Sequence, residues 1–172
     1  MKRSRGFTLI ELMITLLLAA IILALGVPGF QDIVRNNRAA TQSNELVAAL
    51  SLARSEAVKR GARVSLCPST DQATCTGGTN WANGWIVFRD IAANDGAPPV
   101  VEAPPIRVWG ALGGNAALDG PANVRFRALG DAINPVLPAN PFQHRIPGCG
   151  AGDGRDITVN AAGRALVTRV DC

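Results

Sequence analysis

The sequence predicts an α+β protein in which a long N-terminal helix packs on a C-terminal antiparallel β-sheet. Apolar residues gather in the first thirty of the 172 residues, and a one-sided helical pattern follows them. Beyond that pattern, apolar and polar residues alternate with the period of two that is typical of strands. The length suits one domain of ordinary size, and the 48% apolar and 17% charged content argues against wholesale disorder.

The first element is an apolar helix over residues 7–30. These 24 residues carry a single charge, that of Glu11. At ~1.5 Å per residue the helix would be about 36 Å long, enough to cross a hydrocarbon core of roughly 30 Å. The cations Lys2, Arg3 and Arg5 precede it, which favours an N-terminus in the cytoplasm. We therefore predict a single membrane pass, with the rest of the chain outside.

Glu11 is not explained by a secretory signal or a plain membrane anchor. A secretory signal has about 7–15 apolar residues before a small-residue cleavage site, whereas this run is longer and lacks such a site. A carboxylate at this depth costs roughly 2.5–3.5 kcal/mol unless it finds a partner. No second ionisable group lies in the segment, so the partner must come from elsewhere.

The string Gly-Phe-Thr-Leu-Ile-Glu from Gly6 to Glu11 resembles the prepilin processing motif of type IV pilins and type II secretion pseudopilins. The resemblance implies that a prepilin peptidase cuts after Gly6 and removes residues 1–6 as a leader. It also implies that the new N-terminal residue, Phe7, is N-methylated. Pro28 falls on the proline that the family places at mature position 22.

Cleavage would create a cationic amine on Phe7 at the end of an apolar helix. In a filament, Glu11 of one subunit can pair with that amine on its neighbour, which satisfies two buried charges together. Pro28 removes one backbone hydrogen bond and is expected to kink or locally melt the helix. Phe7, Glu11 and Pro28 are thus the expected assembly residues.

After Pro28 the pattern becomes that of an amphipathic helix. Apolar residues recur at spacings of four, three and four, at Leu46, Leu50, Ala53 and Ala57. Gly61 is a natural stop. One helix over residues 8–60 is therefore predicted.

Residues 31–172, which include the second half of this helix, are predicted to form one globular domain, and its strands begin after Gly61. Seven segments have strand periodicity: 63–67, 85–89, 100–102, 106–109, 123–128, 156–160 and 164–170. The segments between them hold most of the 18 Gly and 11 Pro, and residues 91–148 are weakly patterned. Arg125 and Arg127 alternate with apolar neighbours, which predicts that both lie on the wet side of a strand.

Four cysteines allow three pairings. An extracytoplasmic location favours disulfides, and neither spacing is typical of a zinc site. We expect Cys67 to pair with Cys75 and Cys149 with Cys172, the second bridge closing the C-terminal end. On the chain-entropy model the longer loop contributes about 3 kcal/mol.

The body of the chain resembles FimT/GspH-type minor pilins and pseudopilins. The likeness rests on Ala53–Val58 (ARSEAV), Val64–Ser69 (VSLCPS), Gly84–Asp90 (GWIVFRD), Asp156–Asn160 (DITVN) and Gly163-Arg164. It implies a pilin-like fold and a low-abundance subunit that helps initiate or cap a type IV pilus. The expected location is the bacterial inner membrane, with the globular domain in the periplasm and later in a filament of other pilins. A pseudopilin of a type II secretion system is the alternative.

Some FimT-like members also bind DNA through a Gly-Arg-x-Arg motif. Here Gly163-Arg164-Ala165-Leu166 supplies only the first arginine. The candidate DNA-binding residues are Arg164, Arg155, Arg169 and Arg145. Clustered cations are all that phosphate contacts need, but Asp153, Asp156 and Asp171 are interleaved with these arginines. DNA binding is therefore a hypothesis that rests on a half-matched motif.

Net charge does not support that hypothesis. The chain has a formal charge of +4, but losing Lys2, Arg3 and Arg5 with the leader leaves 14 basic and 13 acidic residues, a mature charge of +1. Catalysis is not indicated, because no nucleophile elbow, phosphate loop or acidic metal cluster is present. The single histidine, His144, excludes a centre that needs two. We expect no cofactor and no metal.

Overall fold

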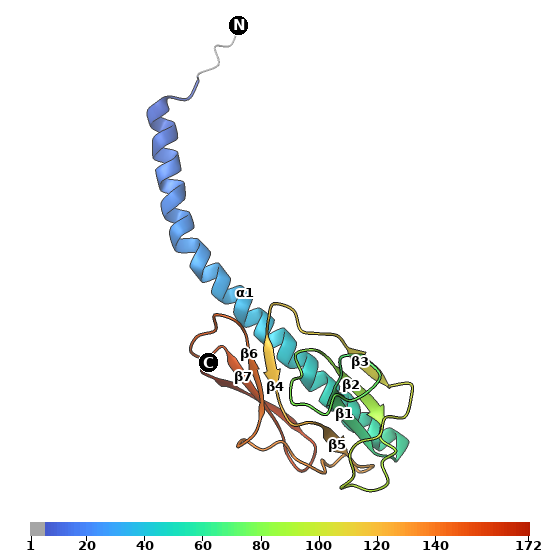
Figure 1. Cartoon of the computed structure of the whole chain (residues 1–172). Helices are drawn as coiled ribbons and strands as arrows, with labels where there is room; N and C mark the ends of the chain where they lie inside the picture. The colour runs from blue at the N-terminus through green and yellow to red at the C-terminus, as the bar shows by residue number, and fades with distance from the viewer. Residues whose placement is uncertain (1–5) are drawn as a thin grey trace. The chain divides into compact units, whose positions relative to one another are not determined.

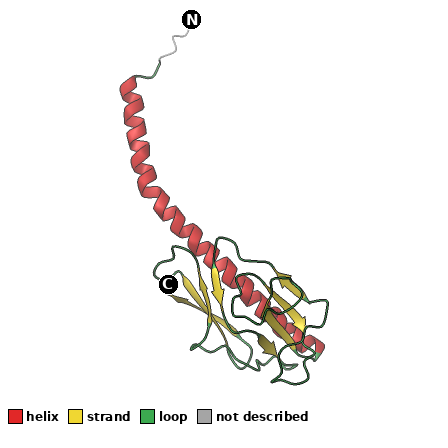
Figure 2. Cartoon of the chain, in the orientation of Figure 1, coloured by secondary structure: helices red, strands yellow, loops and turns green. Residues whose placement is uncertain are grey.

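The computed structural model describes residues 6–172. One helix is followed by eight strands (Figures 1 and 2). Their bounds are α1 Leu9–Arg60, β1 Val64–Pro68, β2 Trp85–Arg89, β3 Arg107–Trp109, β4 Ala117–Asp119, β5 Val124–Phe126, β6 Phe142–Arg145, β7 Gly154–Val159 and β8 Ala165–Val170. The predicted fold class, a long N-terminal helix packed on antiparallel strands, is confirmed.

The chain divides into two compact units between Asn37 and Arg38. In the first unit, α1 contains a stretch long and apolar enough to cross a membrane, and its large apolar side chains are exposed, from Leu9 through Leu23. The backbone at position 28 is helical. The helix is therefore not locally melted at Pro28, which was one of the two expected effects of this residue. The side chain of Pro28, like the leader residues 1–5, lies outside what the structure describes.

The second unit contains two four-stranded antiparallel sheets rather than the one that we predicted. Sheet A has the strand order β3-β2-β1-β5, and sheet B has the order β4-β6-β7-β8. Strands β4 and β6 were not predicted. Conversely, residues 100–102 are not a strand, because only Val101 forms a bridge, with Asp90.

The main core lies between the C-terminal part of α1 and both sheets (Figure 1). The predicted helical stripe is confirmed: Leu46, Leu50, Ala53 and Ala57 are all buried. They pack with apolar side chains of both sheets. One helix face thus covers two sheets, which explains why the buried stripe continues to the last turn of α1.

Two tryptophans anchor this core. Trp81 and Trp85 are fully buried. The Trp81 Nε1 donates to the Pro121 carbonyl at 2.9 Å, and its ring meets Phe142 edge-on at 4.9 Å. These contacts define Trp81 as a core residue that links sheet B to the loop before β2.

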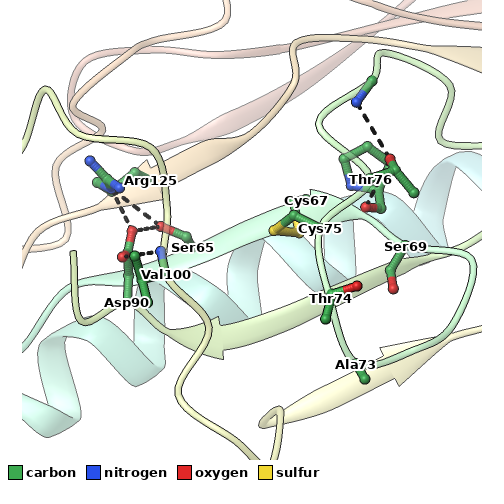
Figure 3. Close-up of a disulfide and its surroundings, with 12 residues drawn as sticks. Ser65, Cys67, Ser69, Ala73, Thr74, Cys75, Thr76, Asp90, Val100 and Arg125 are labelled. Atoms are coloured by element: carbon green, nitrogen blue, oxygen red, sulfur yellow. Dashed lines mark hydrogen bonds and ion pairs between the residues drawn. A yellow bond between two sulfur atoms is a disulfide. The ribbon is translucent and has the colours of Figure 1, made fainter.

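Arg125 does not lie on the wet side of its strand, contrary to the prediction. It is 2% exposed, and its Nε lies 2.6 Å from Asp90 Oδ2 (Figure 3). Its other nitrogens donate to the backbone carbonyls of Asp95 at 2.6 Å and Ala97 at 3.0 Å. The loop after β2 covers this side of β5, and its carbonyl groups replace water around the guanidinium. Arg127 is exposed, as predicted, and pairs with Asp131 and Asp95.

Asp90 joins the loop after β2 to strands β1 and β5. Its Oδ1 accepts the backbone N–H groups of Ala92 and Val100, both at 3.0 Å, and its Oδ2 accepts the Ser65 hydroxyl at 2.6 Å. Burial alone would raise the pKa of this carboxyl. The Ser65 hydroxyl, the two backbone N–H groups and the charge of Arg125 outweigh burial and lower the pKa below its ordinary value.

The structure contains two disulfides, Cys67–Cys75 and Cys149–Cys172, with Cα–Cα distances of 5.5 and 6.0 Å. The first closes the loop after β1 (Figure 3). It packs with Ile86 and Phe88. The second joins the loop before β7 to the C-terminus.

Candidate assembly site and basic groove

The helix start forms a reciprocal cap between Thr8 and Glu11. The Thr8 backbone N–H and hydroxyl both donate to Glu11 Oε2 at 2.9 Å. The Glu11 N–H donates back to Thr8 Oγ1 at 3.3 Å. This arrangement satisfies backbone N–H groups that a helix start otherwise leaves without partners.

Sequence reasoning assigned Glu11 to pairing with another subunit and missed this cap. The signal was present, because a threonine followed three residues later by a glutamate before an apolar run is the pattern of a capping box. Only Oε2 takes part in the cap, and in the described residues Oε1 accepts no hydrogen bond. The cap therefore leaves one carboxylate oxygen for a cation.

The four arginines proposed for DNA do not form one cluster. In the strand register of sheet B, His144 lies opposite Arg155, and Arg155 lies opposite Arg169. Because strand side chains alternate between faces, Arg155 and Arg169 share one face and Arg145 lies on the other. Arg155 is 3% exposed and donates to the Gly152 and Gly154 carbonyls. Arg145 pairs with Asp156 at 2.9 Å.

Arg164 and Arg169 remain exposed, and among the described residues neither forms an ion pair. Arg164 follows the β7–β8 turn and lines a groove of about 560 Å³ between α1 and β8. We call it the α1–β8 groove; its lining residues are Ser51, Arg54, Ser55, Val58, Lys59, Gly163, Arg164 and Ala165. The lining holds three cations and no carboxylate.

Gly163, one of the residues that line the groove, lies in a tight turn. Gly163 has a φ of +74°, and a Cβ at this position would lie 2.1 Å from the Gly130 carbonyl oxygen. Arg54 Nε donates to the same carbonyl at 3.0 Å. The helix and the turn therefore meet at Gly130, and only glycine fits the turn at position 163.

The aspartates near β8 are already engaged. Asp171 accepts the Gly152 N–H at 2.9 Å, and Asp153 accepts the Gly150 N–H at 3.1 Å. Asp156 is the partner of Arg145. In the described residues none of these carboxylates forms an ion pair with Arg164 or Arg169.

His144 is the fully buried polar link between sheet B and α1. Its Nε2 lies 2.9 Å from Gln42 Oε1, and the Gln42 amide donates to the Gly113 carbonyl at 2.9 Å. Its Nδ1 lies 3.5 Å from the Ser43 hydroxyl. A neutral ring that donates from Nε2 fits these partners. Burial, followed by the charges of Arg155 and Arg145, lowers the pKa of His144 to about 4.

This geometry predicts acid-sensitive folding. The unfolded chain takes up a proton at the ordinary histidine pKa, whereas the folded chain resists it down to pH 4. The stability that neutral His144 provides is complete at pH 7.5 and falls by about 3 kcal/mol by pH 4. Urea unfolding of the full chain in detergent, followed by tryptophan fluorescence, measures the loss. His144→Gln should show a smaller loss over this range, and an unchanged loss would contradict the assignment.

No group of three or more His, Cys, Asp or Glu side chains that could hold a metal ion is found in the described part of the chain. The four cysteines are all disulfide-bonded.

The long N-terminal helix and the two antiparallel sheets form a pilin-like fold, and comparisons with known proteins agree. Residues 1–27 match the prokaryotic N-terminal methylation motif, and residues 42–163 match the family described as type II transport protein GspH. Because that match spans more than half of the chain, the protein belongs to the GspH family. Comparison with curated proteins gives no match.

Solved structures show the same fold. Two crystal forms of the type IV minor pilin FimU of Pseudomonas aeruginosa PAO1 are similar, with 22% and 21% identity and TM-scores of 0.55 and 0.57. The similarity covers 75% of this chain and 91% of FimU in one crystal form, and 77% and 89% in the other. The chain is thus a minor pilin or pseudopilin by family and fold, a class of structural subunits rather than enzymes.

Proposed function

We propose that this protein is a low-abundance subunit that helps initiate or cap a type IV pilus. In this proposal the chain resides in the bacterial inner membrane, residues 7–30 span it, and residues 31–172 lie in the periplasm. A prepilin peptidase removes residues 1–6, and the mature chain then joins a filament of other pilins. The observation that carries the proposal is the processing string before the capped helix, with Glu11 at its first turn.

A pseudopilin of a type II secretion system is the second candidate. The description of the matched family favours it, whereas the similar solved structures are of a type IV minor pilin. The same processing, helix and domain serve either filament. Pilus genes or secretion genes next to the coding sequence would distinguish the two, as would purification of the filament that contains the protein.

Processing is the first test. Mass spectrometry of the membrane form should show a chain that begins at N-methylated Phe7. The protein should also be present in filaments sheared from the cells. A bulky substitution such as Gly6→Val should leave the leader in place and remove the protein from the filament fraction. An intact Met1 terminus in cells with an active prepilin peptidase would overturn the proposal.

A further inference from the structure

Strand β8 ends sheet B with an open edge. In the described residues it pairs with β7 and with no other strand. The Asn160 N–H donates to the Arg164 carbonyl at 3.0 Å, and the antiparallel register then continues without interruption from Ala165 to Val170. Hydrogen-bonded pairs alternate along such a ladder. The N–H and C=O groups of Ala165, Val167 and Arg169 therefore point away from β7.

Apart from its arginines, this edge lacks the usual protection against further pairing. Sheet edges are commonly shortened, bulged, charged, interrupted by proline or covered. The edge strands β3, β4 and β5 have three residues each, whereas β8 has six. It contains no proline, and Leu166 and Val167 are 64% and 37% exposed. The edge is therefore long enough to accept another strand.

The positive charge along this edge favours an incoming strand that carries carboxylates. Arg164 and Arg169 are exposed and form no ion pair within the described residues. The α1–β8 groove adds two further cations beside the start of the strand: Arg54, which donates to the Gly130 carbonyl, and Lys59, which lies 3.7 Å from Glu56. An incoming strand that carries carboxylates would therefore complement the charges of Arg164 and Arg169.

We propose that β8 binds an extended acidic segment of a neighbouring filament subunit as an added strand of sheet B. The backbone groups of Ala165, Val167 and Arg169 bond to the incoming strand. Arg164 and Arg169 are five residues apart and therefore lie on opposite faces of the strand. Carboxylates on the two faces of the incoming strand pair with them, and those beside Arg164 enter the α1–β8 groove. Main-chain bonds supply affinity in such strand addition, and side chains supply selectivity. The identity of the partner as a filament subunit rests on the proposed function.

The test uses the mature full-length protein in detergent and a fluorescein-labelled eight-residue peptide in which Glu-Glu pairs alternate with Thr-Val pairs, so that glutamate lies on both faces of the added strand. A matched peptide has lysine in place of glutamate. The glutamate peptide should bind at least tenfold more tightly than the lysine peptide in fluorescence anisotropy. Val167→Pro removes an outward N–H but leaves the ladder to β7, so binding should fall at least tenfold. Val167→Thr, which keeps that N–H, should bind like the wild type.

A charge-reversed variant keeps the proposal testable if the proline variant fails to fold. Arg164→Glu with Arg169→Glu should reverse the preference in favour of the lysine peptide. Equal binding by wild type and Val167→Pro, or an unchanged preference after charge reversal, would overturn the proposal. So would the absence of peptide binding together with tight binding of a DNA duplex, which would define a nucleic-acid surface instead. Incorporation of the wild type into filaments is scored separately, so failure of strand addition is distinguishable from failure of the proposed function.

Discussion

Replacing Asp90 by alanine should lower the free energy of unfolding of the globular unit by about 3–5 kcal/mol, because it leaves Arg125 as a buried charge without its partner. The Asp90 and Arg125 side chains are 0% and 2% exposed. The substitution also removes the acceptor for the Ala92 and Val100 N–H groups. Urea unfolding of the full chain in detergent reports the change, since Trp81 and Trp85 are buried in the core.

The chain offers a matched control for this experiment. Arg89 and Glu102 form an ion pair of the same length, 2.6 Å, but their side chains are 44% and 41% exposed. Glu102→Ala should therefore cost less than about 1 kcal/mol, as is usual for surface pairs. Similar losses in Asp90→Ala and Glu102→Ala would show that burial of the Asp90 pair is not what stabilises the loop after β2.

The Asp90 pair also shows why sequence reasoning failed at Arg125. Alternation along β5 correctly separated Arg125 from Val124 and Phe126. Whether that other face meets water depends on the loop after β2, about thirty residues earlier in the chain. A period-two pattern assigns faces, but it does not reveal which distant segment covers them.

The long helix could be predicted because its signals are local. Apolar periodicity defined the stripe from Leu46 to Ala57, and Gly61 marked the end. Strands β4 and β6 were missed since three or four residues between Gly- and Pro-rich loops carry too little periodicity. Sheet B, and with it the separation of Arg145 from Arg155, depends on those two strands. The four arginines therefore do not share one face, although Arg164 and Arg169 are exposed.

Glu11 is the residue at which local and intermolecular roles can be separated. In the described chain it caps α1 through Oε2, which Thr8 contacts at 2.9 Å. The proposed assembly role instead requires its negative charge, which would meet the Phe7 amine of a neighbouring subunit. Glutamine can serve in a capping box but carries no charge. Thr8→Ala has the opposite effect, because it removes the cap and keeps the carboxylate.

Glu11→Gln should reduce incorporation into filaments at least tenfold, with normal cleavage after Gly6. An unpaired amine in an apolar helix bundle costs roughly 2.5–3.5 kcal/mol, and about 1.4 kcal/mol already corresponds to a tenfold change. Thr8→Ala, which costs the helix only about 0.5–2 kcal/mol, should assemble within about twofold of wild type. Quantitative immunoblots of sheared filaments, normalised to the processed protein in the membrane, measure both. If Thr8→Ala lost incorporation while Glu11→Gln kept it, capping rather than charge pairing would be the assembly role of Glu11.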